Sequence, residues 1–141
     1  MSKGERFTIL EHPSDLGIEA RGGTLATAFE NAAAGMMSVI LDTSTVVARE
    51  TRPVEIYGSD REQMLVRWLS EVLYLYDGQR FAAAEFSLQE LTPTHLRATI
   101  RGELLDAERH RTKVDVKAVT YHQLEVHDSG QRAFVRVFLD I

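Results

Sequence analysis

The 141-residue chain has no cysteine, only three prolines, and no apolar run long enough to cross a membrane. The absence of cysteine excludes disulfides, thiolate zinc sites and cysteine nucleophiles, and it fits a reducing compartment. The opening residues, MSKGERFTIL, lack the apolar segment of a signal peptide. We therefore expect a cytoplasmic protein that does not contact a membrane.

Positive charge is also scarce, because 16 Lys and Arg face 21 Asp and Glu and leave a net charge of -5. Binding to bare nucleic acid needs a basic face, so no strong direct nucleic-acid binding is expected. The chain has neither a glycine-rich phosphate loop nor a GxSxG elbow, which disfavours P-loop and α/β-hydrolase chemistry. A composition of 44% hydrophobic and 26% charged residues without a linker predicts a single domain over residues 1–141.

Two segments have a helical period. The first is expected to begin after Thr24, a suitable N-cap, and to carry an apolar stripe from Leu25 to Ile40. The second is expected to begin after Asp60, which has Gln63 at capping-box spacing, and to end at Gly78.

Most other segments alternate apolar and polar residues, which is typical of strands. Those at 96–101, 114–117, 124–127 and 133–140 predict a meander, with a tight turn at 128–130. Many strands and two helices predict an α+β fold, in which both helices pack on one side of a mostly antiparallel sheet.

Two acidic positions are candidate metal ligands. Asp15 lies in the segment Glu11–Gly17, where it either bonds its own backbone in a turn or offers a hard oxygen to a metal. At the other end of the sequence, Asp140 and the carboxylate of Ile141 are either solvated or neutralised by a cation. Spacing alone leaves both alternatives open.

A third candidate segment is Lys117–His122. Lys117 could reach an anion while Tyr121 or His122 contacts a partner, or these could be ordinary strand residues. His122 and His127 are five apart, which predicts opposite faces of one strand and no zinc site. His110 lies in the polar stretch 106–112, which is expected to be a solvated connection.

Over essentially its whole length, the chain resembles the archease family. The resemblance is carried by HPSDLG at 12–17, where relatives often read HTADIG, and by the helical segments 24–33 and 68–74. Gly102–Glu103, the segment KAVTYH at 117–122 and the final Asp140–Ile141 complete it. The substitution of Pro13–Ser14 for Thr-Ala leaves Asp15 in register.

This resemblance implies a non-enzymatic activator of the RNA ligase RtcB, which acts in tRNA splicing and RNA repair. The activator promotes transfer of GMP from GTP onto the ligase and speeds its turnover. The resemblance also implies a divalent metal site, of calcium type, whose ligands are Asp15, Asp140 and Ile141. The residues expected to contact the partner or a phosphate are Lys117, His12, Tyr121 and His122.

Other functions remain open. Archeases have been linked to keeping tRNA methyltransferases soluble and specific, so a chaperone-like role with such enzymes is one alternative. A small metal-dependent hydrolase, with Asp15 and Asp140 as ligands and His122 as base, is another. A scaffold that binds no metal is the third.

Overall fold

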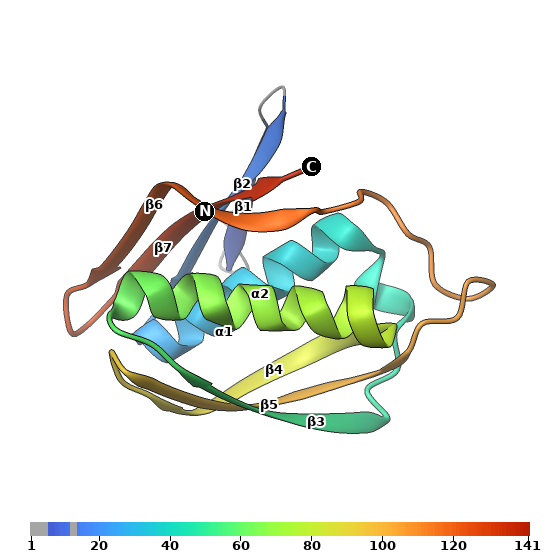
Figure 1. The fold of residues 1–141 in the computed structure, drawn as a ribbon, viewed down its shortest axis with the longest axis horizontal. Coiled ribbons are helices and arrows are strands. Elements are labelled where there is room, and N and C mark those ends of the chain that lie inside the picture. The colour runs from blue at the N-terminus through green and yellow to red at the C-terminus, as the bar shows by residue number, and fades with distance from the viewer. Residues whose placement is uncertain (1–5, 12–13) are drawn as a thin grey trace.

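The computed structural model describes residues 6–11 and 14–141, and in this part of the chain two long helices lie between two antiparallel sheets (Figure 1). None of its helices is long and apolar enough to span a membrane. The elements in chain order are β1 (Phe7–Glu11), β2 (Asp15–Gly22), α1 (Leu25–Ile40), the 3-10 turn η1 (Thr43–Thr45), β3 (Glu50–Tyr57), α2 (Arg61–Gln79), β4 (Phe81–Leu91), β5 (His95–Leu104), β6 (Ala118–Asp128) and β7 (Ala133–Asp140).

The first and last parts of the chain share one sheet. Its order is β1-β2-β7-β6, and the second sheet has the order β3-β5-β4. Every pairing between these strands is antiparallel. The α+β prediction is confirmed, since each sheet turns one face toward the helix layer (Figure 1).

Alternation along β2 and β7 builds the core side of the four-stranded sheet. Ile18, Ala20, Val135, Val137 and Leu139 are fully buried there. These inward residues stand two apart, so every second residue of β2 and β7 points to the opposite, outer face. The outer face carries the candidate site described below.

The helix starts follow the predicted capping. The Thr24 hydroxyl accepts the Thr27 amide at 3.1 Å, and the Asp60 carboxylate accepts the Gln63 amide at 2.7 Å. The end predicted for the second helix is wrong by a small margin. Gly78 is still helical, and the chain turns at Arg80, which adopts a left-handed backbone conformation with φ 57°.

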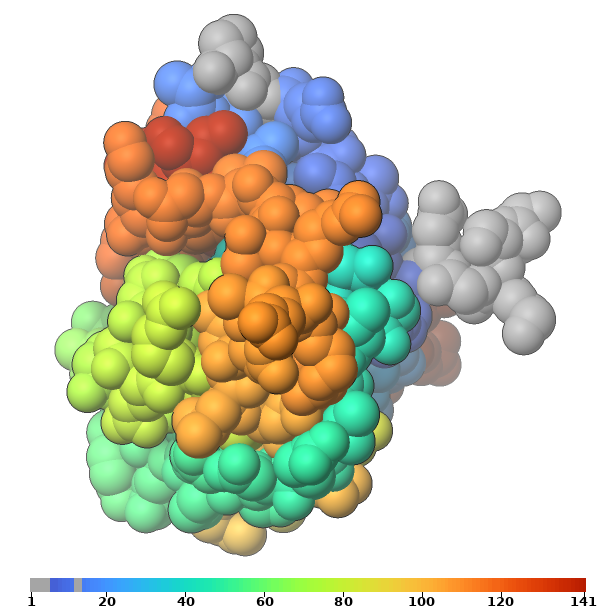
Figure 2. Space-filling model, turned by 90° about the vertical axis from the view of Figure 1, so that its right-hand side faces the viewer, coloured from blue at the N-terminus to red at the C-terminus, as the bar shows by residue number. Residues whose placement is uncertain are grey.

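The predicted meander is wrong in two respects. β5 belongs to the other sheet, so the chain crosses from one sheet to the other between β5 and β6. Residues 114–117 form no strand, because their connection binds the end of α1 instead. The amides of Lys113 and Val114 donate to the carbonyls of Ile40 and Val39, at 2.8 and 3.2 Å. Figure 2 shows this connection, in orange, covering one end of the helix layer.

A buried carboxylate fixes the start of the connection. Glu103, at the end of β5, accepts two hydrogen bonds from Arg109, at 2.7 and 2.9 Å. It also accepts the Val47 amide at 2.8 Å and pairs with Arg49 at 3.0 Å. The Arg109 contacts, followed by the Val47 amide, hold the pKa of Glu103 far below its ordinary value.

His110 completes this cluster, which corrects the prediction of a solvated connection at 106–112. Its side chain is fully buried, with Nε2 lying 2.9 Å from Glu103. Its Nδ1 accepts the Asp106 amide at 2.9 Å, so the proton of the neutral ring must sit on Nε2 and be donated to Glu103. Although the stretch 106–112 is polar in sequence, His110 is buried within it and fixes the connection to Glu103.

The Glu103 cluster predicts acid sensitivity. The depressed pKa contributes stability that is complete above the unfolded value of 4.5 and is lost as the pH falls below it. Glu103→Gln should lower the melting temperature at neutral pH and flatten its decline between about pH 5 and pH 3. Thermal melts across this range should show the wild-type slope in the exposed control Glu108→Gln, and an unchanged slope in Glu103→Gln would contradict the assignment.

At Gly102, one residue before Glu103, close packing against β4 predicts that no larger residue fits. A β-carbon at this position would lie 2.0 Å from the Ala82 carbonyl oxygen on β4, where the strands shift register. Gly102→Ala should therefore lower the free energy of unfolding by about 1–3 kcal/mol in urea titrations. Gly23→Ala is the matched control, because a β-carbon there meets nothing within 4 Å. Equal stability of the two variants would contradict this interpretation.

Candidate metal and partner-binding site

The pairing of β2 with β7 brings together two acidic residues that are 125 positions apart. Their register runs from Asp15 opposite Asp140 to Gly22 opposite Ala133. Residues directly opposite each other on antiparallel strands send their side chains to the same face. Asp15 and Asp140 therefore stand side by side at one end of the outer face, Asp15 half-buried and Asp140 exposed.

Lys117 reaches the same end from the other side of β7. Its amide donates to the Asp140 carbonyl at 2.7 Å, and Ala118 is the β6 partner of Asp140. Ile141 follows Asp140 directly, and its half-buried side chain packs against the core. The main chain of four of the predicted site residues, Asp15, Lys117, Asp140 and Ile141, is thus fixed at one edge by strand pairing and core packing.

The next cross-strand pair on the outer face is covered by an aromatic ring. Phe138 is the β7 partner of Gly17, and its ring lies over that glycine. A β-carbon on Gly17 would lie 2.8 Å from the ring, so the glycine makes room for it. Although it faces outward, Phe138 is only 3% exposed. The outer face is therefore apolar at the pair next to the two aspartates.

β6 bulges beside this ring. Thr120 pairs with Phe138, but the next registered pair is Glu125 with Arg136, so four residues of β6 oppose one of β7. Gln123 takes a left-handed conformation with φ 52°, and Tyr121 is 57% exposed. Such bulges bend a strand and redirect its side chains, here next to the Thr120–Phe138 pair.

The bulge overturns the prediction that His122 and His127 lie on opposite faces. The His122 ring meets the edge of Phe138 with centroids 6.0 Å apart, and the His127 ring stacks with Phe134 at 6.0 Å. Both phenylalanines belong to the outer face, since they are four residues apart on β7. In a regular strand, a spacing of five would place the two histidines on opposite faces. The extra residues of the bulge shift the alternation of β6, so both histidines lie on the same face.

One outward-facing pair, Gly17 with Phe138, separates the aspartates from a third feature of the outer face that the sequence did not reveal. Arg136 donates to Glu19 at 2.8 Å and to Glu125 at 2.6 Å, linking β2, β7 and β6. The His127 hydrogen bond and then Arg136 lower the pKa of Glu125. Charge alternation along single strands contains no signal for this row, because its members come from three strands.

The remaining predicted residue, His12, lies outside the described residues. Within the described ranges, no group of three or more His, Cys, Asp or Glu side chains is placed to hold a metal. A site at Asp15 and Asp140 therefore needs further oxygens from main chain, water or a partner. Two adjacent carboxylates suit a hard cation such as Ca²⁺, which takes oxygen ligands in flexible geometry.

Comparison with known proteins places the chain in a family. The model of the archease protein family matches residues 7–141. Protein archease of Methanosarcina acetivorans is 36% identical over 144 residues, covering 99% of both chains, and that of Methanothermobacter thermautotrophicus is 37% identical, covering 96% and 98%.

Solved structures agree with this placement. The solution structure of Methanobacterium thermoautotrophicum protein 1598 has a TM-score of 0.81 and 37% identity, covering 96% of this chain and 99% of that one. A crystal structure from Thermotoga maritima, of a protein described as an archease and possible chaperone, shares the fold at 19% identity and a TM-score of 0.59, covering 94% of each chain. The chain therefore belongs to the archease family.

Proposed function

We propose that this archease is a non-enzymatic activator of the RNA ligase RtcB, and that it acts through a divalent cation held by Asp15 and Asp140. The ligase first takes GMP from GTP, and the archease promotes this guanylylation and the turnover that follows. The proposal assigns this function to particular residues of this chain. It places the activity in the cytoplasm, where the ligase joins RNA ends.

The observation that supports it best is the pairing of Asp15 with Asp140 across β2 and β7. Like charges directly opposite each other on a sheet destabilise the pair, so a purely structural role does not favour two aspartates here. A bound cation offsets this repulsion. Ca²⁺ is the cation that best suits these oxygens, and the carboxylate of Ile141 would be a third ligand.

The other site residues have separate roles in the proposed contact with the ligase. A bound cation would supply positive charge at the edge of the molecule. Lys117, held against Asp140 through its backbone, would place its ammonium group near a phosphate. Tyr121 and His122 would contact the ligase surface, because both are exposed on the bulge and the His122 ring lies against Phe138, the residue that follows the aspartates on the outer face. His12 belongs to the same proposed contact on sequence grounds alone.

Replacing either aspartate should strongly reduce activation. Asp15→Asn and Asp140→Asn each remove a charge but keep the side-chain shape, so both variants should melt close to wild type. Each should reduce the stimulation of RtcB guanylylation at least about tenfold, since even groups that only orient metal ligands contribute this much. The measurement is formation of ligase-GMP from GTP with a divalent metal and substoichiometric archease.

Asp77→Asn is the matched control, because it makes the same chemical change at an exposed position on the last turn of α2. It should activate like wild type. Full activation by Asp15→Asn, with a ligase shown to be active, would refute the proposed site. No activation by the wild-type protein would refute the function itself.

The alternatives are separated by two further assays. A chaperone for tRNA methyltransferases should suppress light scattering by such an enzyme in both wild type and Asp15→Asn. A metal-dependent hydrolase should cleave RNA with metal and no ligase, and should lose that cleavage in His122→Gln. The activator proposal predicts neither result.

A further inference from the structure

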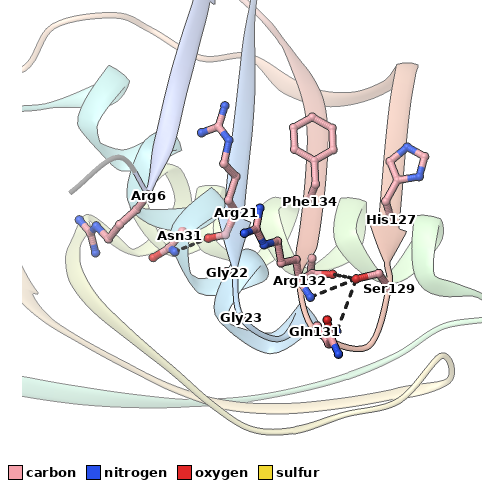
Figure 3. A pocket seen from close by; sticks show the side chains of 11 residues that line it. Arg6, Arg21, Gly22, Gly23, Asn31, His127, Ser129, Gln131, Arg132 and Phe134 are labelled. Carbon is pink, nitrogen blue, oxygen red and sulfur yellow. Dashed lines mark hydrogen bonds between the residues drawn. The ribbon is translucent and has the colours of Figure 1, made fainter. Parts of the chain in front are cut away.

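The outer face ends in a second feature, a basic hollow about 20 Å along β2 from the aspartates, given about 3.4 Å per strand residue. Its cavity has a volume of about 740 Å³ and lies between the end of β2 and the β6–β7 turn (Figure 3). The residues that matter here are Arg6, Arg21, Arg132, Gly23, His127 and Phe134. None of the lining residues is Asp or Glu. The hollow is therefore a local concentration of positive charge on an acidic chain.

The carboxylates nearest to the hollow are already engaged. Glu19 and Glu125 both bind Arg136, and Glu125 also hydrogen-bonds the edge of the His127 ring at 2.8 Å. Asp128 accepts the Gly130 amide at 2.9 Å in the turn. Arg21 reaches Glu19 only at 3.4 Å. In the described part of the chain, no carboxylate pairs with Arg6 or Arg132. Their guanidinium groups can therefore bind an external anion without breaking an internal ion pair.

Aromatic rings stand beside these cations. Arg21, Phe134 and His127 are cross-strand partners on β2, β7 and β6, so their side chains form one row on the same face (Figure 3). The Phe134 and His127 rings are stacked, with an interplanar angle of 27°. The Arg21 guanidinium lies 6.0 Å from the Phe134 ring centre. Flat rings next to guanidinium groups form a surface on which a nucleobase can stack.

We propose that this hollow binds a nucleotide, with its phosphate at Arg21 and Arg132 and its base against His127 and Phe134; the Arg6 side chain points away from these two arginines at the rim of the hollow (Figure 3). Arginine is suited to this task because its planar guanidinium binds phosphate oxygens in pairs. The cavity volume lies within the range of small-molecule sites. An acidic peptide would satisfy the arginines but leave the rings uncovered, so a nucleotide fits the whole surface better.

The ligand is either a free nucleotide or one residue of a single-stranded RNA. Both present the same phosphate and base, and both would bind weakly, because a single hollow on a chain of net charge -5 gives little long-range attraction. This site is separate from the Asp15–Asp140 pair and does not depend on the proposed ligase activation.

Gly23 provides a precise test. It lines the hollow, its backbone lies outside the left-handed region, and a β-carbon there meets nothing within 4 Å. Gly23→Glu should therefore fold normally while placing a negative charge at the arginines, and Gly23→Ala is its uncharged control. Arg132→Gln removes one cation from the hollow, and Arg111→Gln removes one from an exposed position on the 105–117 connection.

Binding is measured by fluorescence anisotropy with a labelled six-residue single-stranded RNA, and by NMR titration with GMP. Gly23→Glu and Arg132→Gln should each weaken binding about tenfold, the cost of a lost charge-assisted contact. Gly23→Ala, Arg111→Gln and Asp15→Asn should bind like wild type. The amides of residues 21, 127 and 134 should shift in the titration. Similar affinity for both ligands would identify a nucleotide site, and tighter binding of the RNA would identify a strand site.

Three results would overturn the proposal. They are the absence of binding by either ligand, equal binding by Gly23→Glu and wild type, and tighter binding of an acidic peptide of matched length. Because Asp15→Asn keeps this site intact, loss of ligase activation in that variant leaves the nucleotide proposal unaffected. Conversely, normal ligase activation by Gly23→Glu would leave the metal proposal unaffected.

Discussion

The register of β2 against β7 is the constraint on which the rest of the structure depends. Eight consecutive pairs bind a strand near the start of the sequence to the strand near its end. One face of these pairs is mostly buried against the helices, so a slip by one residue would turn Ile18 and Val137 toward solvent. The same register that protects the core places Asp15 opposite Asp140 and Arg21 opposite Phe134. Packing on one face thus sets the chemistry of the other.

The outer face has opposite character at its two ends. The acidic end suits a cation and the basic end suits a phosphate, and the hydrogen-bonded row of Glu19, Arg136 and Glu125 lies between them. This row keeps the two ends apart on the outer face. In our account, this surface offers a partner two distinct charged contacts.

Local sequence signals predicted the local structure well. Thr24 and Asp60 cap their helices, and the turn at 128–130 forms with Gly130 at φ 89°. Division of the strands between two sheets was not predictable, because alternation marks a strand but does not identify its neighbour. The β6 bulge escaped prediction for the same reason, since a bulge exists only relative to the partner strand. His110 looked solvated because its partner, Glu103, lies on another element.

The candidate site was predictable only in part. The residues alone made Asp15, Lys117 and Asp140 candidates without deciding between alternatives, and resemblance to a family favoured their functional roles. The fold brings their backbones to one edge. The basic hollow could not be anticipated, because its arginines come from separate segments and the total charge of the chain points the other way.

The central claim is that Asp15 and Asp140 form a single cation site, and NMR titration with Ca²⁺ tests it most directly. Our account predicts saturable shifts at the amides of residues 15, 117 and 140, with those of 21 and 134 unchanged, and loss of all these shifts in Asp140→Asn. Shifts that persist in that variant, or that centre on another part of the molecule, would contradict it.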